Sequence, residues 1–222
     1  MAAMIRENAG KKSYVPVGAA VVFAVLYTTG VLMVGALPGI DKPGTAVVSH
    51  LRDHGGQMRV QTLFLTLGSL ALVTVLGYAR ARLDGPSAYV FTIGSAMMLV
   101  EVSIATWFFS GLALHATSLD PGTARALLDV ASMFGPILTA ADVMIAVPIV
   151  LAAKAGRFPR WLGILAAVFA IEQLVETVTI VGGPGLFISP GGPMNTYLGG
   201  TLFIIFFLAL GAVLSWAPQP QT

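Results

Sequence analysis

The chain has 222 residues, of which 56% are hydrophobic and 10% charged, and its mean hydropathy is +0.86. Soluble domains are nearer a quarter charged, so this composition excludes a water-soluble globular protein and predicts a multi-pass membrane protein. The net charge of +2 gives no basis for nucleic-acid binding, and the absence of cysteine excludes disulfides and thiolate chemistry.

Six apolar segments follow one another along the chain, and each reaches the roughly 20 residues that a helix needs to cross a bilayer. We therefore expect an all-α fold, a six-transmembrane-helix bundle that makes up a single membrane domain over residues 1–222. The spans are predicted at about 15–37, 60–79, 88–114, 124–153, 161–181 and 194–217. The first segment has a longer apolar core than a signal peptide, so we expect it to be an anchor.

The connection after the first span contains two histidines. A short helix is predicted over 45–54, ended by the pair Gly55-Gly56. It places His50 and His54 at a spacing that can bind a metal. The sequence H-L-R-D-H lacks the glutamate of the H-E-x-x-H motif, so we favour a solvated pair and predict no metal site.

The later connections carry turn and capping signals. Asp120 is placed to cap a helix that has Pro121 in its first turn. The segment 182–195 is rich in glycine and proline, but it lacks the lysine and the strand–loop–helix context of a nucleotide loop. We expect it to form a lid or a re-entrant cover at the outer side of the bundle.

Basic residues predict the orientation in the membrane. With six spans and the N-terminus inside, the inner segments hold eight basic residues and the outer segments four. The positive-inside rule therefore predicts a protein of the cell (inner) membrane with cytoplasmic N- and C-termini. The inner set consists of Arg6, Lys11, Lys12, Arg80, Arg82, Lys154, Arg157 and Arg160.

The turn between the fourth and fifth spans has the pattern G-x-x-P-R-W-L-G, over residues 156–163. Together with the stretch DPGTARALLD at 120–129, it resembles a large group of mostly uncharacterised bacterial six-span integral membrane proteins. The resemblance implies the six-helix architecture. It implies no catalytic residues, because the group has no established common activity.

Four of the ten acidic residues fall inside predicted spans, and from the helical rise all four lie between the midplane and the outer half of the membrane. We expect these to be the catalytic residues: Glu101, Asp142, Glu172 and Glu176. Three consecutive helices carry them, so convergence in one polar pocket is expected. Pro136 and Pro148 on the fourth span are expected to bend the helix around the second of these acids.

Several polar and aromatic side chains at similar depth are candidates for contacting a substrate. They are Trp107, Tyr27, Gln173, Asn195 and Tyr197. For Trp107, packing against lipid is the simpler alternative. A further histidine, His115, falls in an outer connection and is expected to be an interfacial polar residue.

Carboxyls that share a site of low dielectric repel one another, so at least one of them is expected to keep its proton. A neutral carboxyl beside an ionised one is an acid/base pair. We expect a membrane-embedded enzyme of isomerase, cyclase or hydrolase type, which needs no cofactor and whose partners are a lipophilic small-molecule substrate and the lipid bilayer. No nucleic-acid partner is expected, and the sequence leaves open whether the protein forms a homo-oligomer.

Three alternatives remain from the sequence alone. The same acids suit a proton relay in a small proton-coupled transporter or substrate-capture subunit, or a site for a hard cation such as Mg²⁺. They could also be simple hydrogen-bonding groups that fasten helices together, in a non-catalytic subunit of a membrane complex.

Overall fold

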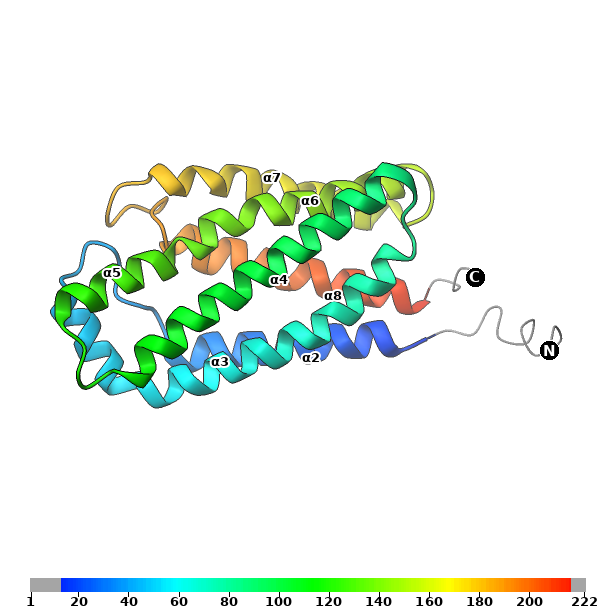
Figure 1. Cartoon of the computed structure of the whole chain (residues 1–222). Helices are drawn as coiled ribbons and strands as arrows, with labels where there is room; N and C mark the ends of the chain where they lie inside the picture. The colour runs from blue at the N-terminus through cyan, green and yellow to red at the C-terminus, as the bar shows by residue number, and fades with distance from the viewer. Residues whose placement is uncertain (1–12, 217–222) are drawn as a thin grey trace.

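The computed structural model describes residues 13–216, and within this range it consists of helices and their connections, with no β-strand (Figure 1). Six helical segments are long and apolar enough to cross a membrane. The predicted all-α six-helix bundle is confirmed, and the chain is a multi-pass membrane protein. Arg6, Lys11 and Lys12 of the topology prediction, and the last residue of the predicted sixth span, lie outside the described residues.

The helical elements follow one another with short connections. In chain order they are α2 (Val15–Val34), α3 (Gly44–Arg80), α4 (Gly85–Leu114), α5 (Pro121–Ser132), α6 (Phe134–Lys154), α7 (Arg160–Glu176), the 3₁₀ helix η1 (Thr177–Val181), the π-helix η2 (Met194–Gly199) and α8 (Gly200–Trp216). Each long helix packs against the next one along the chain, and α8 returns to α2, so the six spans form a closed ring.

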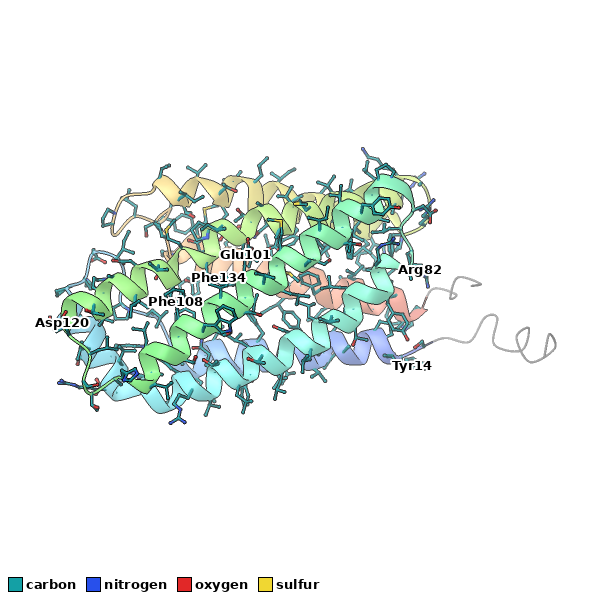
Figure 2. All side chains as sticks on the ribbon, viewed as in Figure 1. Tyr14, Arg82, Glu101, Phe108, Asp120 and Phe134 are labelled. Atoms are coloured by element: carbon teal, nitrogen blue, oxygen red, sulfur yellow. The ribbon has the colours of Figure 1, made fainter. Side chains whose placement is uncertain are left out.

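The two ends of the bundle differ (Figure 1). The terminal end is the one where α2 begins and α8 finishes, and the loop end holds the connections 35–43, 115–120 and 182–193. Figure 2 shows Tyr14 and Arg82 at the terminal end and Asp120 at the loop end. As predicted, Asp120 caps α5, because its carboxylate accepts a hydrogen bond from the Thr123 N–H at 3.0 Å.

The predicted stop at Gly55-Gly56 is wrong, because α3 runs without a break for 37 residues. A glycine in the interior of a helix costs about 0.5–1 kcal/mol relative to alanine. Packing offsets this cost at Gly55, which is buried, and a Cβ atom there would lie 3.4 Å from the Cβ of Ala116. The glycine therefore marks a close contact between α3 and the end of α4, not the end of a helix.

The helix of the fourth span is interrupted near the first of its two prolines. α5 ends at Ser132 and α6 begins at Phe134, just before Pro136. Proline has no N–H to donate, and its ring collides with the carbonyl four residues earlier, which here belongs to Ser132. Pro148 lies within α6 without ending it.

Two kinds of contact hold the ring together. Glycines let helices approach closely, as at Gly94, where a Cβ atom would lie 2.6 Å from the Cβ of Met144 on α6. Phenylalanine rings from α2, α7 and α8 fill the space between those helices, and we call them the aromatic core: Phe23, Phe169, Phe203, Phe206 and Phe207. In lipid, packing of this kind stabilises a bundle, because apolar burial alone gives little driving force.

Candidate functional site: a buried carboxyl cluster

The four intramembrane acids come from α4, α6 and α7, three helices that pack against one another in sequence. Asp142 and Glu176 are buried, with 1% and 3% of their surface exposed, while Glu101 and Glu172 are half-buried. The carboxyl of Asp142 is within electrostatic reach of the other three. Glu101 lies midway along α4, where α4 passes α6 (Figure 2). We call these four residues the carboxyl cluster.

On α7, the side chain of Gln173 holds two members of the cluster together. Glu172 and Glu176 are four residues apart and share one side of the helix. The Gln173 amide nitrogen, Nε2, donates to an oxygen of Glu172 at 2.8 Å and to an oxygen of Glu176 at 3.1 Å. One donor therefore fixes both carboxyls in place.

Asn195 binds the carboxyl of Glu176 at the oxygen that Gln173 does not contact. Its amide nitrogen donates to the Oε1 atom of Glu176 and, at 3.3 Å, to the hydroxyl of Thr179. The Glu176 carboxyl also lies against Gly199, where a Cβ atom would come within 2.1 Å of Oε2. A residue with a side chain at that position would displace the carboxyl. The start of the last span is thus shaped around Glu176.

Near the cluster the helices change their hydrogen-bonding pattern. α7 tightens into the 3₁₀ helix η1 directly after Glu176, and Asn195 lies in the π-helix η2. Hydroxyls satisfy carbonyls at this transition: Thr177 donates to the Gln173 carbonyl at 3.1 Å, and Thr179 donates to the Glu176 carbonyl at 2.7 Å. Short 3₁₀ and π segments within helices occur frequently at functional sites.

Thr139 connects α6 to this transition. Its hydroxyl lies 2.8 Å from the hydroxyl of Thr177 and 2.7 Å from the carbonyl oxygen of Pro136, so its single proton is shared between these two acceptors. The loop-end part of α6 is therefore tied to η1, one turn from Asp142. This contact fixes the position of the buried aspartate relative to the two glutamates.

Several buried oxygens of the carboxyl cluster and of Asn195 beside it have no hydrogen-bond partner among the described residues. They are Oε2 of Glu101, Oδ1 of Asp142, Oε1 of Glu172 and Oδ1 of Asn195. Among the described residues, no lysine, arginine or histidine forms an ion pair with any of the four acids. A buried acceptor without a donor costs about 1–3 kcal/mol. The site therefore has an excess of acceptors, which a proton on a carboxyl or a ligand with donor groups would satisfy.

The residues that the structure describes contain no group of three or more His, Asp or Glu side chains arranged to hold a metal ion. His50 and His54 stack with ring centroids 4.4 Å apart, and Nδ1 of His54 lies 3.1 Å from the His50 carbonyl oxygen. His115 is exposed at the end of α4.

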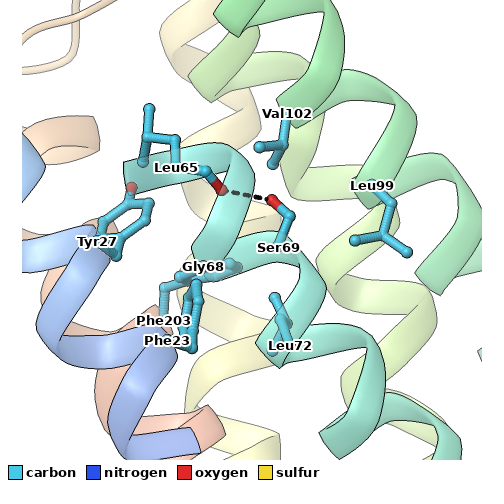
Figure 3. Close-up of a pocket in the computed structure, with 9 residues that line it drawn as sticks. All are labelled: Phe23, Tyr27, Leu65, Gly68, Ser69, Leu72, Leu99, Val102 and Phe203. Atoms are coloured by element: carbon cyan, nitrogen blue, oxygen red, sulfur yellow. Dashed lines mark hydrogen bonds between the residues drawn. The ribbon is translucent and has the colours of Figure 1, made fainter. Parts of the chain in front are cut away.

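Tyr27 of α2 links the carboxyl cluster to an apolar pocket. Its phenol is within electrostatic reach of Asp142 and Glu176, and its ring packs against Phe23 and Phe203 at centroid distances of 5.6 and 5.8 Å. Figure 3 shows the pocket, which Tyr27 lines together with Phe23, Leu65, Gly68, Ser69, Leu72, Leu99, Val102 and Phe203. The Ser69 hydroxyl donates to the Leu65 carbonyl at 2.8 Å, and the cavity volume is only about 10 Å³, so this is a small gap in the packing between α2, α3, α4 and α8.

The predicted substrate-contacting residues separate into two groups. Gln173 and Asn195 hydrogen-bond within the cluster, and Tyr27 lies at its edge. Trp107 and Tyr197 are instead 70% and 64% exposed, which places their rings on the outside of the bundle. For Trp107 this exposure agrees with packing against lipid.

Thr139 and Thr179, which hold the helix transition beside the cluster, are polar residues that the sequence already places at the depth of the acids. Sequence reasoning missed Gly199, which lies against the Glu176 carboxyl. Glycine is common in apolar spans, so no pattern in the sequence distinguishes this one from its neighbours.

No known protein family, no curated protein and no solved structure matches this chain. The functional interpretation therefore rests on the geometry and chemistry of the carboxyl cluster.

Proposed function

We propose that the protein is a membrane-embedded acid/base enzyme, of isomerase, cyclase or hydrolase type, that acts on a lipophilic small molecule. The observation that carries the proposal is the carboxyl cluster itself. Three acids lie within electrostatic reach of Asp142, and in the described part of the chain some of the buried oxygens of the four acids have no partner and no base pairs with them. A merely structural cluster would be expected to satisfy these oxygens.

Hydrogen-bond donors suggest different roles for two members of the cluster. Glu176 accepts hydrogen bonds from the amides of Gln173 and Asn195, and donors of this kind stabilise a carboxylate. Asp142 is fully buried and has an oxygen without a donor, an environment that favours the neutral acid. Asp142 is therefore the general acid of the proposal, and Glu176 the general base.

In the proposed reaction, the O–H bond of Asp142 breaks as its proton passes to a carbon or oxygen of the substrate. Glu176 takes a proton from a neighbouring position, so that a double bond moves or a ring closes without net gain or loss of protons. Return of the proton from Glu176 to Asp142 within the cluster restores the starting state. Tyr27, which is within electrostatic reach of both acids, would donate a hydrogen bond to a polar end of the substrate.

The test compares cells that produce the wild-type protein with cells that produce Asp142→Asn or Glu176→Gln. Lipid-soluble molecules from membranes and from the purified protein are profiled by mass spectrometry. We expect a molecule that is converted only by the wild type, because loss of a general acid or base lowers turnover by about 10²–10⁴-fold. The control is Asp53→Asn, which alters an exposed acid on α3.

Conversion that proceeds unchanged in both cluster variants would contradict the enzyme proposal. So would the absence of any molecule whose amount differs between the wild type and the variants. In each case the variants must still purify as folded protein with the thermal unfolding temperature of the Asp53→Asn control.

A proton-coupled transporter is the second candidate, and the irregular helices favour it. Transporters place interrupted helices at their binding sites near the middle of the membrane, and both η1 and η2 adjoin the carboxyl cluster. This candidate predicts that proteoliposomes with a pH gradient accumulate a solute that is chemically unchanged. A non-catalytic subunit would instead tolerate Asp142→Asn and co-purify with a partner.

A further inference from the structure

A second site lies at the terminal end of the bundle, away from the carboxyl cluster. The last turns of α6 and the first turns of α7 enclose a groove whose apolar lining is Val150, Ala153, Gly163, Ile164 and Ala167. Small residues make its floor: a Cβ atom on Gly163 would lie 2.6 Å from the Cβ of Ala153. The two helices are therefore close at the floor, and Ile164, which is 66% exposed, borders a cleft open to the surrounding lipid.

Two cationic side chains, Lys154 and Arg160, also line this groove. Both are exposed, and neither has an ion pair or hydrogen bond within the described residues. The neighbouring Arg157 is different, because it pairs with Asp84 at 2.5 Å. The groove thus combines an apolar floor with two positive charges that no group among residues 13–216 neutralises.

The adjacent tryptophan indicates the depth of the groove in the membrane. Trp161 is 51% exposed and follows Arg160 directly. Exposed tryptophans are enriched at the level of the lipid headgroups. The two cations therefore lie at headgroup level, with the apolar floor extending towards the hydrocarbon.

We propose that this groove binds one anionic phospholipid, with its phosphate between Lys154 and Arg160 and an acyl chain along the floor formed by Ala153, Gly163 and Ala167. Basic pockets between transmembrane helices bind anionic lipid headgroups in this way. Charge complementarity selects the anionic lipid over a zwitterionic one of the same chain length. This inference does not depend on the function proposed for the carboxyl cluster.

The experiment titrates the purified full-length protein in detergent with phosphatidylglycerol or with phosphatidylcholine of identical chains, and native mass spectrometry counts the bound lipid. We expect selective retention of phosphatidylglycerol by the wild type. A basic side chain near an anionic headgroup contributes about fivefold in affinity, so the double variant Lys154→Ala/Arg160→Ala should bind it about 25-fold more weakly. The matched control is Arg52→Ala/Arg59→Ala, which removes the same charge near the loop end.

Two further measurements separate a lipid from other occupants. Ala167→Leu fills the floor and leaves both cations in place, so it should also weaken phosphatidylglycerol binding. Glycerol phosphate, which has the same anionic group without acyl chains, should not compete. Equal binding of the two lipids, equal weakening in the Arg52→Ala/Arg59→Ala control, or competition by glycerol phosphate would each overturn the proposal.

Discussion

Within three turns, the buried face of α7 changes from an aromatic side chain to polar and acidic ones. Phe169, Gln173 and Glu176 share the buried face of this helix. Phe169 belongs to the aromatic core, where its ring stacks on Phe206 with centroids 4.8 Å apart. One turn later the same face presents an amide, and after another turn a carboxyl. The aromatic core and the carboxyl cluster are therefore neighbours on one helix, and the comparison between them is direct.

The aromatic core and the carboxyl cluster differ in how completely their side chains find packing or hydrogen-bond partners. The aromatic core lies on continuous α-helices and is filled by rings in edge-to-face or stacked contact. The α7 part of the carboxyl cluster lies where α-helix gives way to 3₁₀ geometry, opposite the π-helix η2, and the cluster contains buried oxygens that have no partner among the described residues. The proposed function would account for this difference, since sites kept for chemistry are often less stable than they could be.

The largest effect is expected in the aromatic core. Phe206→Ala should lower the free energy of unfolding by about 3–5 kcal/mol, because it removes a fully buried ring and leaves a cavity. Unfolding in mixed micelles, followed by tryptophan fluorescence, measures the change. The control is Ile205→Ala on the lipid-facing side, where the residue is 45% exposed and the loss should be much smaller. Similar losses for the two variants would show that the rings do not form the stabilising core.

A smaller effect is expected at the best-bonded acid of the carboxyl cluster. Glu176→Ala removes the acceptor for the amides of Gln173 and Asn195, and leaving such donors unpaired costs about 1–3 kcal/mol. Glu176→Gln keeps one carbonyl oxygen as an acceptor, so its loss should be smaller. The same unfolding assay ranks the two variants. If both were as stable as the wild type, Glu176 would not be held by these amides.

Hydropathy predicted the fold because lipid leaves few options: an apolar segment of sufficient length must be a helix that satisfies its own backbone. The capping role of Asp120 was equally local and is confirmed. The continuity of α3 through Gly55 was not predictable, since it depends on a contact with the end of α4, far away in the sequence. Local signals thus failed where a tertiary contact decided the outcome.

The candidate site was only partly accessible from the sequence. Charged residues inside apolar spans are conspicuous, so the four acids could be named, and their depth followed from the helical rise. The sequence does not show which face of each helix points to the bundle interior, because lipid-facing and buried faces are both apolar. For that reason the sequence could not show that the rings of Trp107 and Tyr197 lie on the outside of the bundle. Gly199 could not be found at all, since its role depends on where the Glu176 carboxyl lies.

Gly199→Ala tests the close contact between Gly199 and the Glu176 carboxyl, and its expected effect on the free energy of unfolding is of intermediate size. The new Cβ would overlap the Glu176 carboxyl, which must move and give up its bond to Asn195, a loss of about 0.5–1.5 kcal/mol. The control is Gly77→Ala on α3, where no atom lies within 4 Å of the new Cβ and the φ angle is helical. That change should raise the free energy of unfolding by about 0.5–1 kcal/mol. Opposite signs for the two substitutions in the unfolding assay would support the fit, and a gain for both would contradict it.

The smallest effect on stability, and the most informative about the cluster, is expected for Asp142→Asn. Hydrogen bonds that fasten membrane helices are worth about 0.6 kcal/mol on average and at most about 1.7 kcal/mol. Asp142 has an unpartnered buried oxygen and no ion pair, so its replacement by a neutral amide should change the free energy of unfolding by less than about 0.5 kcal/mol. Turnover should nevertheless be lost, because the amide has no proton to donate. A loss of stability above about 1.7 kcal/mol with conversion retained would instead make Asp142 a fastener between helices, and the chemical contrast between the aromatic core and the carboxyl cluster would disappear.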